Sequence, residues 1–314
     1  ALAALTSGAQ NTAIGYQSLS TETDGAANTA VGYRAGYQLA GTSNNNVIMG
    51  YGVMGGADTN GDNNVAIGYN VMASNDLNTA DNNVAIGYTA LSALTTGTKN
   101  IAIGSTALNL ATTALNNVAI GYDAMGDLPA GQAVAGCVAI GYEAFLGDGT
   151  NNDTASNGTI CIGYQAGKVL RNLYGSEPNL FIGFTSGLAT TRGAGNTAVG
   201  YASLEINVHG SRNTAVGWKA LRQSAPASET YTYNTAVGYM AGESISTGVQ
   251  NTGLGASCAF DIDANNQTAI GYGATTASTG ANTIMMGNGS MTDIYMGDDG
   301  NAWSQVSDKR LKRN

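Results

Sequence analysis

The chain has 314 residues, of which 45 are Gly and only 11% are charged, an unusual composition for a globular enzyme. Its net charge is −9, but four of its 12 basic residues stand in the last six positions, so residues 1–306 carry 8 basic and 20 acidic side chains, or −12. This balance argues against binding to nucleic acid backbones, and no apolar run reaches the length of about 18 residues that suggests a membrane span.

A short phrase, NTAVGY or a close variant, recurs along the chain and sets the predicted elements. Aligned on its central Gly, it occurs in sixteen copies spaced 16 to 22 residues apart. The residues before each Gly alternate branched, small, branched, which is the period of a β-strand with one buried face. We expect the branched residues, such as Thr197 and Val199, to form the core. In chain order the anchor glycines are Gly15, Gly32, Gly50, Gly68, Gly87, Gly104, Gly121, Gly141, Gly163, Gly183, Gly200, Gly217, Gly238, Gly255, Gly271 and Gly287.

Three positions around the anchor glycine form columns when the copies are aligned. Asn stands four residues before it in twelve copies, and an aromatic residue follows it directly in thirteen. We expect the Asn side chains to hydrogen-bond along the stack, the Gly to mark a bend with positive φ or a close backbone approach, and the rings to form a stripe. Members of these columns include Asn11, Asn28, Asn196, Asn213, Asn234, Gly15, Gly32, Gly200, Gly217, Tyr16, Tyr33, Tyr201 and Tyr239.

Strands that recur at this spacing leave no room for a helix of ten or more residues between them. The pattern therefore predicts an all-β fold, a parallel β-solenoid in which each copy is one coil stacked on the next. Sixteen coils at about 4.8 Å per strand give a rod on the order of 75 Å long. All three Pro fall in the variable inserts, which supports the alignment because Pro cannot donate to a strand ladder.

The repeats predict a β-solenoid domain over residues 1–290. Its opening, ALAALTSGAQN, matches ALSALTTGTKN further on, so we expect the chain to begin within a repeat. After Gly287 the rhythm fails, and we interpret residues 291–306 as a neck that caps the solenoid. The basic residues 307–314 form a separate C-terminal segment.

One insert offers a weak candidate metal site. Asp58, Asn60 and Asp62 alternate in DTNGDNN as the ligands of a calcium loop do. However, Asn63 and Tyr69 stand where such a loop needs Gly and Glu, so solvated turn residues are the simpler interpretation. A related stretch, DGTNND, follows later in the chain, and nothing in the sequence implies a cofactor.

Few residues suit catalysis. The single histidine, His209, argues against a Ser-His-Asp triad or a zinc site. The stretch Gly50–Gly55 matches GxGxxG only in its letters, because its first Gly is an anchor glycine. The three Cys stand in or beside predicted strands, as buried thiols do. Scattered Asp and Glu in the inserts leave open a composite carboxylate site for sugar hydrolysis, completed between subunits.

Two columns suggest surface functions. A rank of Thr three residues before the anchor glycine could order water as ice-binding proteins do, but the column holds Val or Ile in eight copies, which fits a buried position better. The Tyr column could stack sugars. We expect it instead to pack against itself or against a neighbouring subunit.

With the columns laid out, NTAVGY.AL and NNVAIGY.AL resemble the head repeats of trimeric autotransporter adhesins, and more closely the longer repeats of marine phage tail-fibre proteins, those of cyanophages in particular. The resemblance covers roughly residues 1–290. It implies a left-handed β-roll assembled as a homotrimer. The adhesin repeat is shorter and more regular than the one here.

The ending SDKRLK resembles the start of the intramolecular chaperone domain of endosialidases and phage tail spikes. In that family the domain promotes trimerisation and then cuts itself off. The resemblance implies that Ser307 is the nucleophile, that Lys312 is its partner, and that the chain is cut after Ser307. A Ser beside a Lys of lowered pKa can attack a backbone carbonyl without any His. A solvated basic tail is the alternative.

Together these features predict a structural and receptor-binding viral tail-fibre protein, a rod with no turnover of its own, located on the virion tail. Its expected partners are two further copies of the chain, other virion tail proteins, and a glycan or protein receptor on the host cell surface. Multivalency would strengthen weak individual contacts. The alternatives are a bacterial trimeric autotransporter adhesin head and a polysaccharide depolymerase tail spike.

Overall fold

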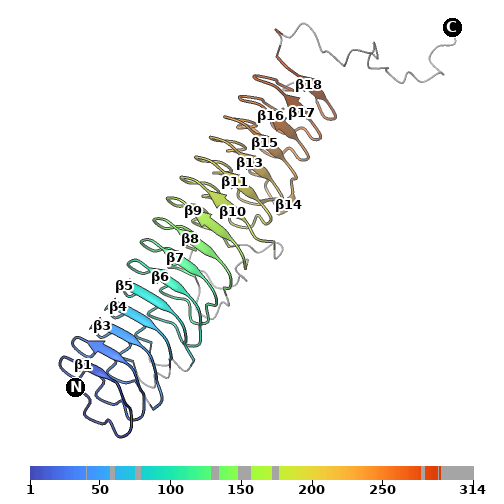
Figure 1. Cartoon of the computed structure of the whole chain (residues 1–314). Coiled ribbons are helices and arrows are strands. Elements are labelled where there is room, and N and C mark those ends of the chain that lie inside the picture. The colour runs from blue at the N-terminus through green and yellow to red at the C-terminus, as the bar shows by residue number, and fades with distance from the viewer. Residues whose placement is uncertain are drawn as a thin grey trace, which may run out of the picture.

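The protein is an elongated, all-β parallel β-solenoid with strands stacked from β1 to β18, as seen in a computed structural model (Figure 1). The structure describes residues 1–39, 41–56, 61–74, 79–128, 134–147, 157–171, 177–276, 280–288 and 290. The predicted neck at residues 291–306 and the segment at 307–314 lie outside these residues. No helix in the described part of the chain has the length and apolar character that crossing a bilayer requires.

Sixteen strands form one parallel sheet, and each precedes or includes one of the anchor glycines. Adjacent strands pair in register, so that Thr197 lies beside Thr214 and Ala198 beside Ala215. Two shorter strands, β12 and β14, pair in a second sheet within the inserts, which the repeat pattern did not predict. The strands are β1 (Thr12–Ile14), β2 (Thr29–Val31), β3 (Val47–Tyr51), β4 (Val65–Tyr69), β5 (Val84–Tyr88), β6 (Ile101–Ile103), β7 (Val118–Ile120), β8 (Val138–Ile140), β9 (Ile160–Ile162), β10 (Leu180–Ile182), β11 (Thr197–Val199), β12 (Gly210–Ser211), β13 (Thr214–Val216), β14 (Thr230–Tyr231), β15 (Thr235–Val237), β16 (Thr252–Leu254), β17 (Thr268–Ile270) and β18 (Ile284–Met286).

The prediction that the branched strand residues form the core is wrong. In β11 the small residue Ala198 is fully buried, whereas Thr197 and Val199 on either side of it are only half-buried. The physical reason is space. A long side chain four residues after the anchor glycine, Leu204 in this coil, is also fully buried, and it leaves room for only a small side chain opposite.

Departures from this pattern compensate one another. In β10 the small position holds Phe181, which is fully buried, and the position four residues after the anchor glycine is Gly187. A Cβ on Gly187 would lie 2.7 Å from the Phe181 ring, and one on Gly167 in the preceding coil would lie 2.9 Å from it. The interior therefore keeps a constant volume by exchanging which position supplies the bulk.

The anchor glycine is required for two reasons, as the sequence predicts. Gly200 has φ of +140°, a conformation that residues with a Cβ rarely adopt. In addition, a Cβ on Gly200 would lie only 2.3 Å from the carbonyl oxygen of Gly217 in the next coil. The backbones of successive coils thus approach so closely at this column that no side chain fits.

Candidate interaction surface

The outer face of the large sheet is the most extensive feature that could contact another molecule. Because strand side chains alternate, Val65, Ile67 and Tyr69 of β4 point to the same outer side. We call this face the strand wall; it consists of the side chains three and one before each anchor glycine and the residue directly after it. Apolar members remain accessible, with exposed fractions of 38% for Ile101 and 42% for Leu254.

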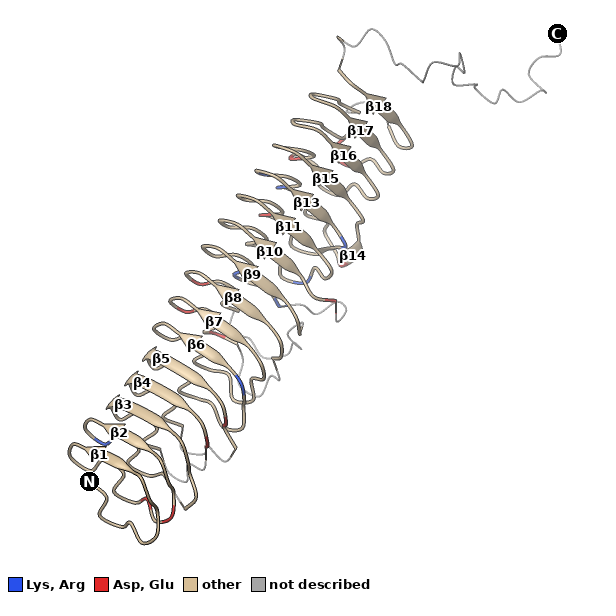
Figure 2. Ribbon diagram, viewed as in Figure 1, with Lys and Arg blue, Asp and Glu red and all other residues tan. Residues whose placement is uncertain are grey.

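The strand wall is uncharged. None of the eighteen strands contains Lys, Arg, Asp or Glu, and the charged residues lie in the turns and inserts of the described chain (Figure 2). Contiguous apolar faces of this length are unusual on monomeric soluble proteins and mark contact surfaces. The Thr column belongs to this wall and is not buried, so burial no longer argues against ice binding. The Val and Ile of eight copies still interrupt the rank of hydroxyls.

The aromatic column packs against itself, as predicted. Neighbouring rings are stacked, with centroids 4.9 Å apart for Tyr33 and Tyr51 and 5.4 Å apart for Tyr16 and Tyr33. Ser105 and Ala256 interrupt the column, which leaves two runs of stacked rings and Tyr272 beyond the second interruption. The first run is Tyr16, Tyr33, Tyr51, Tyr69 and Tyr88, and the second is Tyr122, Tyr142, Tyr164, Phe184, Tyr201, Trp218 and Tyr239.

The Asn column forms the predicted hydrogen-bond ladder inside the solenoid. The backbone N–H and side-chain Nδ2 of Asn213 both donate to Oδ1 of Asn196, at 2.9 and 3.0 Å. Oδ1 of Asn213 in turn accepts from the backbone N–H of Asn234 at 3.0 Å. All three residues are buried, so these amides hold the coils together and do not face a ligand.

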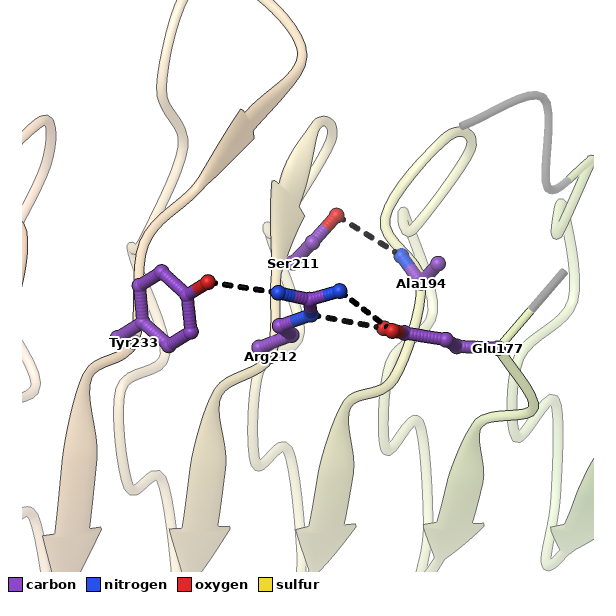
Figure 3. Close-up of polar contacts among 5 residues, drawn as sticks. All are labelled: Glu177, Ala194, Ser211, Arg212 and Tyr233. Carbon is purple, nitrogen blue, oxygen red and sulfur yellow. Dashed lines mark hydrogen bonds and ion pairs between the residues drawn. The ribbon is translucent and has the colours of Figure 1, made fainter. Parts of the chain in front are cut away.

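A charged cluster lies on the insert side of β10 to β15 (Figure 3). Nε and Nη2 of Arg212 donate to the two carboxylate oxygens of Glu177 at 2.9 and 2.5 Å, and Nη1 donates to the Tyr233 hydroxyl at 2.6 Å. The guanidinium also lies 4.0 Å from the ring centroid of Tyr231. A planar cation held by both a carboxylate and an aromatic ring is well fixed, and this cluster ties several coils together.

The cluster depends on a glycine between its two charges. Gly195 stands in the intervening coil, and a Cβ there would lie 2.6 Å from Oε2 of Glu177. Because Gly195 has no side chain, the Glu177 carboxylate reaches across this coil to Arg212. Hydrogen bonds from Arg212 lower the pKa of Glu177, and the same bonds raise the pKa of Arg212.

The candidate calcium ligands fall partly outside the described residues, which include Asp62 but neither Asp58 nor Asn60. Oδ1 of Asp62 accepts the backbone N–H of Asn44 at 2.6 Å, which gives this carboxylate a structural role. Ser211 acts in the same way, since its Oγ accepts the N–H of Ala194 at 3.0 Å (Figure 3). Within the described ranges, no three His, Cys, Asp or Glu residues gather as a metal site.

Asp127 and Glu143 are one pair of carboxylates close enough for the charge of one to affect the pKa of the other. Burial, followed by the charges of Asp123 and Glu143, raises the pKa of Asp127. Burial acts to raise the pKa of Glu143 as well, but hydrogen bonds from Lys168 and Gln165 together lower it. Lys168 Nζ lies 2.5 Å from Glu143 Oε2, so this carboxylate is engaged in an ion pair.

The remaining candidates from the sequence are the Ser307–Lys312 pair, the three cysteines, His209 and the GxGxxG match. Ser307 and Lys312 lie outside the described residues. All three Cys are buried, as predicted, and burial raises the pKa of the Cys137 thiol to about 11, which keeps it protonated at neutral pH. His209 lies in an insert, with Nδ1 buried and without a hydrogen-bond partner. Gly50 in the GxGxxG match is an anchor glycine with φ of +129°.

Sequence reasoning missed the Arg212 cluster and a pocket beside Arg34. The alignment held a signal for the first, because Gly195, Arg212 and Tyr233 share the position five residues before successive anchor glycines. Columns of that kind predict which side chains are neighbours in adjacent coils. The polar contacts within a column depend on side-chain length and on missing side chains, which the repeat does not encode.

Comparisons with family models, with curated proteins and with solved structures found no match to the chain.

Proposed function

We propose that the chain is the shaft and receptor-contacting part of a viral tail fibre, a homotrimer of left-handed β-solenoids of sixteen coils each. Its work is adhesive and mechanical: it joins other virion tail proteins to a glycan or protein on the host surface and turns over no substrate. Backbone ladders along the whole rod make it stiff, and inserts repeated three times around it offer multivalent contacts.

The observation that carries this proposal is the strand wall. An uncharged, apolar and aromatic face that follows the whole sheet is costly to leave in water, and association with two further copies would cover it. Half-exposed Ile101, Val237 and Leu254 are spread along it, as continuous burial between parallel rods requires. The inserts carry the charges and would remain outside, available to a receptor.

Sedimentation equilibrium tests the assembly. We expect a trimer mass for the chain and a shift toward monomer when Ile101→Asp places a charge on the wall. Leu110→Asp is the matched control, because Leu110 in an insert is 39% exposed and Ile101 is 38% exposed. A monomeric wild-type chain, or equal weakening by both variants, would contradict the trimer. An experimental density map of the fibre would give the hand and the number of complete coils.

Binding of the fluorescent protein to a panel of marine cyanobacteria tests the attachment. We expect binding to some strains and competition with phage adsorption to them. A bacterial adhesin head would instead be found on its own producer's cell surface. Release of oligosaccharides from host capsule or lipopolysaccharide would show a depolymerase and overturn the non-enzymatic function.

The proposed self-cleavage concerns Ser307 and Lys312 alone. Mass spectrometry of the protein produced from the complete gene should find a C-terminus at Ser307, and Ser307→Ala should abolish that product. An intact wild-type chain would leave the basic residues 307–314 as a solvated tail.

A further inference from the structure

A pocket of about 340 Å³ opens at the edge of the aromatic column near the start of the rod. Its lining includes Arg34, Tyr37, Gln38, Tyr51 and Asn70. This volume lies within the lower part of the range of pockets that hold small ligands, roughly 300–1,000 Å³. The pocket is open to solvent along the surface, so a unit within a longer chain could enter it.

The pocket exists because one coil lacks a side chain. Gly52 stands two residues after its anchor glycine, where the coils on either side carry Arg34 and Asn70. A Cβ on Gly52 would lie 2.4 Å from Oδ1 of Asn70, so a side chain there would fill the space between the two neighbours. The missing side chain of Gly52 thus leaves a notch one coil high, with the cation of Arg34 on one side and the amide of Asn70 on the other.

Arg34 differs from the other cations that have contacts in the described chain. Five of these, at positions 168, 192, 212, 219 and 222, form ion pairs with Glu. No carboxylate of the described residues pairs with Arg34. Its Nε donates to Oε1 of Gln17 at 2.9 Å, and its guanidinium lies 5.0 Å from the ring centroid of Tyr37.

Arg34 is also the only Lys or Arg in the first 98 residues, which contain six Asp and Glu. In this acidic part of the chain, an anion would find favourable charge only beside Arg34. Arg34 lines this open pocket, and a guanidinium carries parallel N–H donors that match the two oxygens of a carboxylate.

The other lining residues indicate what carries the carboxylate. The Tyr37 ring lies beside the guanidinium, and Tyr51 lines the pocket where it meets the edge of the strand wall. Aromatic rings pack against the C–H faces of sugar rings, while amides such as those of Gln38 and Asn70 suit hydroxyl groups. We propose that this pocket binds a carboxylate-bearing saccharide unit of an acidic polysaccharide. The inference rests on the proposed attachment to host glycans and names their chemistry.

Calorimetric titration of the assembled protein with trigalacturonate, and with galactotriose as its uncharged counterpart, tests the proposal. We expect trigalacturonate to bind more tightly, and added salt to weaken it. Arg34→Gln should weaken binding by at least about tenfold, because a charged hydrogen-bond donor is lost. Gly52→Asn should abolish it by filling the notch with the residue that the next coil carries.

Thr89→Asn is the matched control, since it places the same residue in the same column away from the pocket and should bind as the wild type does. Equal affinity for the two saccharides, no binding to the wild type, or unchanged binding by Arg34→Gln would overturn the inference. If the wild type attaches to host cells but ignores trigalacturonate, the acidic-saccharide site fails and the attachment function stands. If it binds trigalacturonate but no host cell, the attachment function fails.

Discussion

The buried amide of Asn213 bonds to the coils on both sides of it. Its Nδ2 donates to Asn196, while its Oδ1 accepts from Asn234 and from the Thr232 hydroxyl, the latter at 2.7 Å. An Asn at this position therefore satisfies its own polar atoms and a backbone N–H of the next coil. Without it, that buried N–H would have no partner and no access to water.

Asn213→Ala should lower the free energy of unfolding by about 1–3 kcal/mol, the range for leaving a buried donor unsatisfied. Asn265→Ala is the control. Oδ1 of Asn265 also accepts a backbone N–H, that of Val249 at 2.9 Å, but this bond is exposed and water can replace the amide. Chemical denaturation of both variants measures the difference. Equal losses would mean that burial of the ladder contributes nothing.

The Glu177–Arg212 ion pair predicts an acid-dependent stability. Because the pKa of Glu177 in the folded protein lies below its ordinary value of 4.5, the pair stabilises the fold above that pH and loses this contribution as pH falls through the lowered pKa. Arg212→Gln should therefore lower Tm at neutral pH, with the gap to the wild type closing in acid. The two side chains are 35% and 42% exposed, so solvent screens the pair and the effect on Tm is small.

Glu177→Gln is the control for this ion pair, since it mimics the protonated carboxyl at every pH. Its Tm should run parallel to that of Arg212→Gln through the acid range. A gap between wild type and Arg212→Gln that stays constant down to the acid limit would rule out Glu177 as its source.

At the scale of one coil, stability depends on matching the small strand position with the position four residues after the anchor glycine. Seven of the sixteen repeats pair Ala with Leu or Met, as Ala198 and Leu204 do, whereas β10 pairs Phe181 with Gly187. The two arrangements fill the same interior. Exchanging one member alone leaves either a cavity or a clash.

Phe181→Ala should destabilise the protein by about 3–5 kcal/mol through a cavity. Gly187→Leu alone should also destabilise it, because its Cβ would lie 2.7 Å from the Phe181 ring. The double variant recreates the usual pairing and should be more stable than Phe181→Ala. Denaturation of the three variants gives the coupling energy, expected to reach about 1 kcal/mol or more. Additive losses would show that the two positions do not share one space.

The same coil shows where prediction from sequence succeeded and where it failed. Asn196, Gly200 and Tyr201 each revealed their roles, because amide ladders, a bend and ring stacking follow from residue type once copies are aligned. The sequence did not reveal which face of the strand points inward. The alternation of Thr197, Ala198 and Val199 is compatible with either face being buried. Hydrophobicity alone favours burial of the branched residues. Because the buried Leu204 side chain occupies most of the interior of the coil, only the small Ala198 side chain fits inside.

For the candidate sites the limit was different. Arg34 had no signature in the repeat, because its pocket arises from a side chain that Gly52 lacks in the next coil. Likewise, Arg212 meets Glu177 only across Gly195. Such features lie between coils, and an alignment of single repeats records each residue without the one above it.

For the whole molecule, in-register pairing predicts that one complete repeat can be removed. Deletion of residues 104–120 joins Ile103 to Gly121, keeps every column aligned, and brings Tyr88 next to Tyr122 so that the two aromatic runs become one. Because each coil contacts mainly its neighbours, stability should fall only by the share of one coil. Circular dichroism and thermal unfolding should show a folded, cooperative protein.

Deletion of residues 104–111 is the comparison, since it removes half a repeat and puts the strand columns out of register. A one-residue shift already turns core side chains to the surface, and we expect this variant to unfold or aggregate. If both deletions were tolerated equally, the columns would not determine the register.

The close approach of backbones at the anchor glycine also bears on how such a gene changes with time. The backbone at Val199 and Gly200 has the same conformation and the same contact with the following coil as the backbone at Val216 and Gly217. Unequal recombination between the encoding segments would therefore yield a longer or shorter chain whose junctions are already compatible. Insert loops could be exchanged, duplicated or lost in this way while the interior is inherited unchanged.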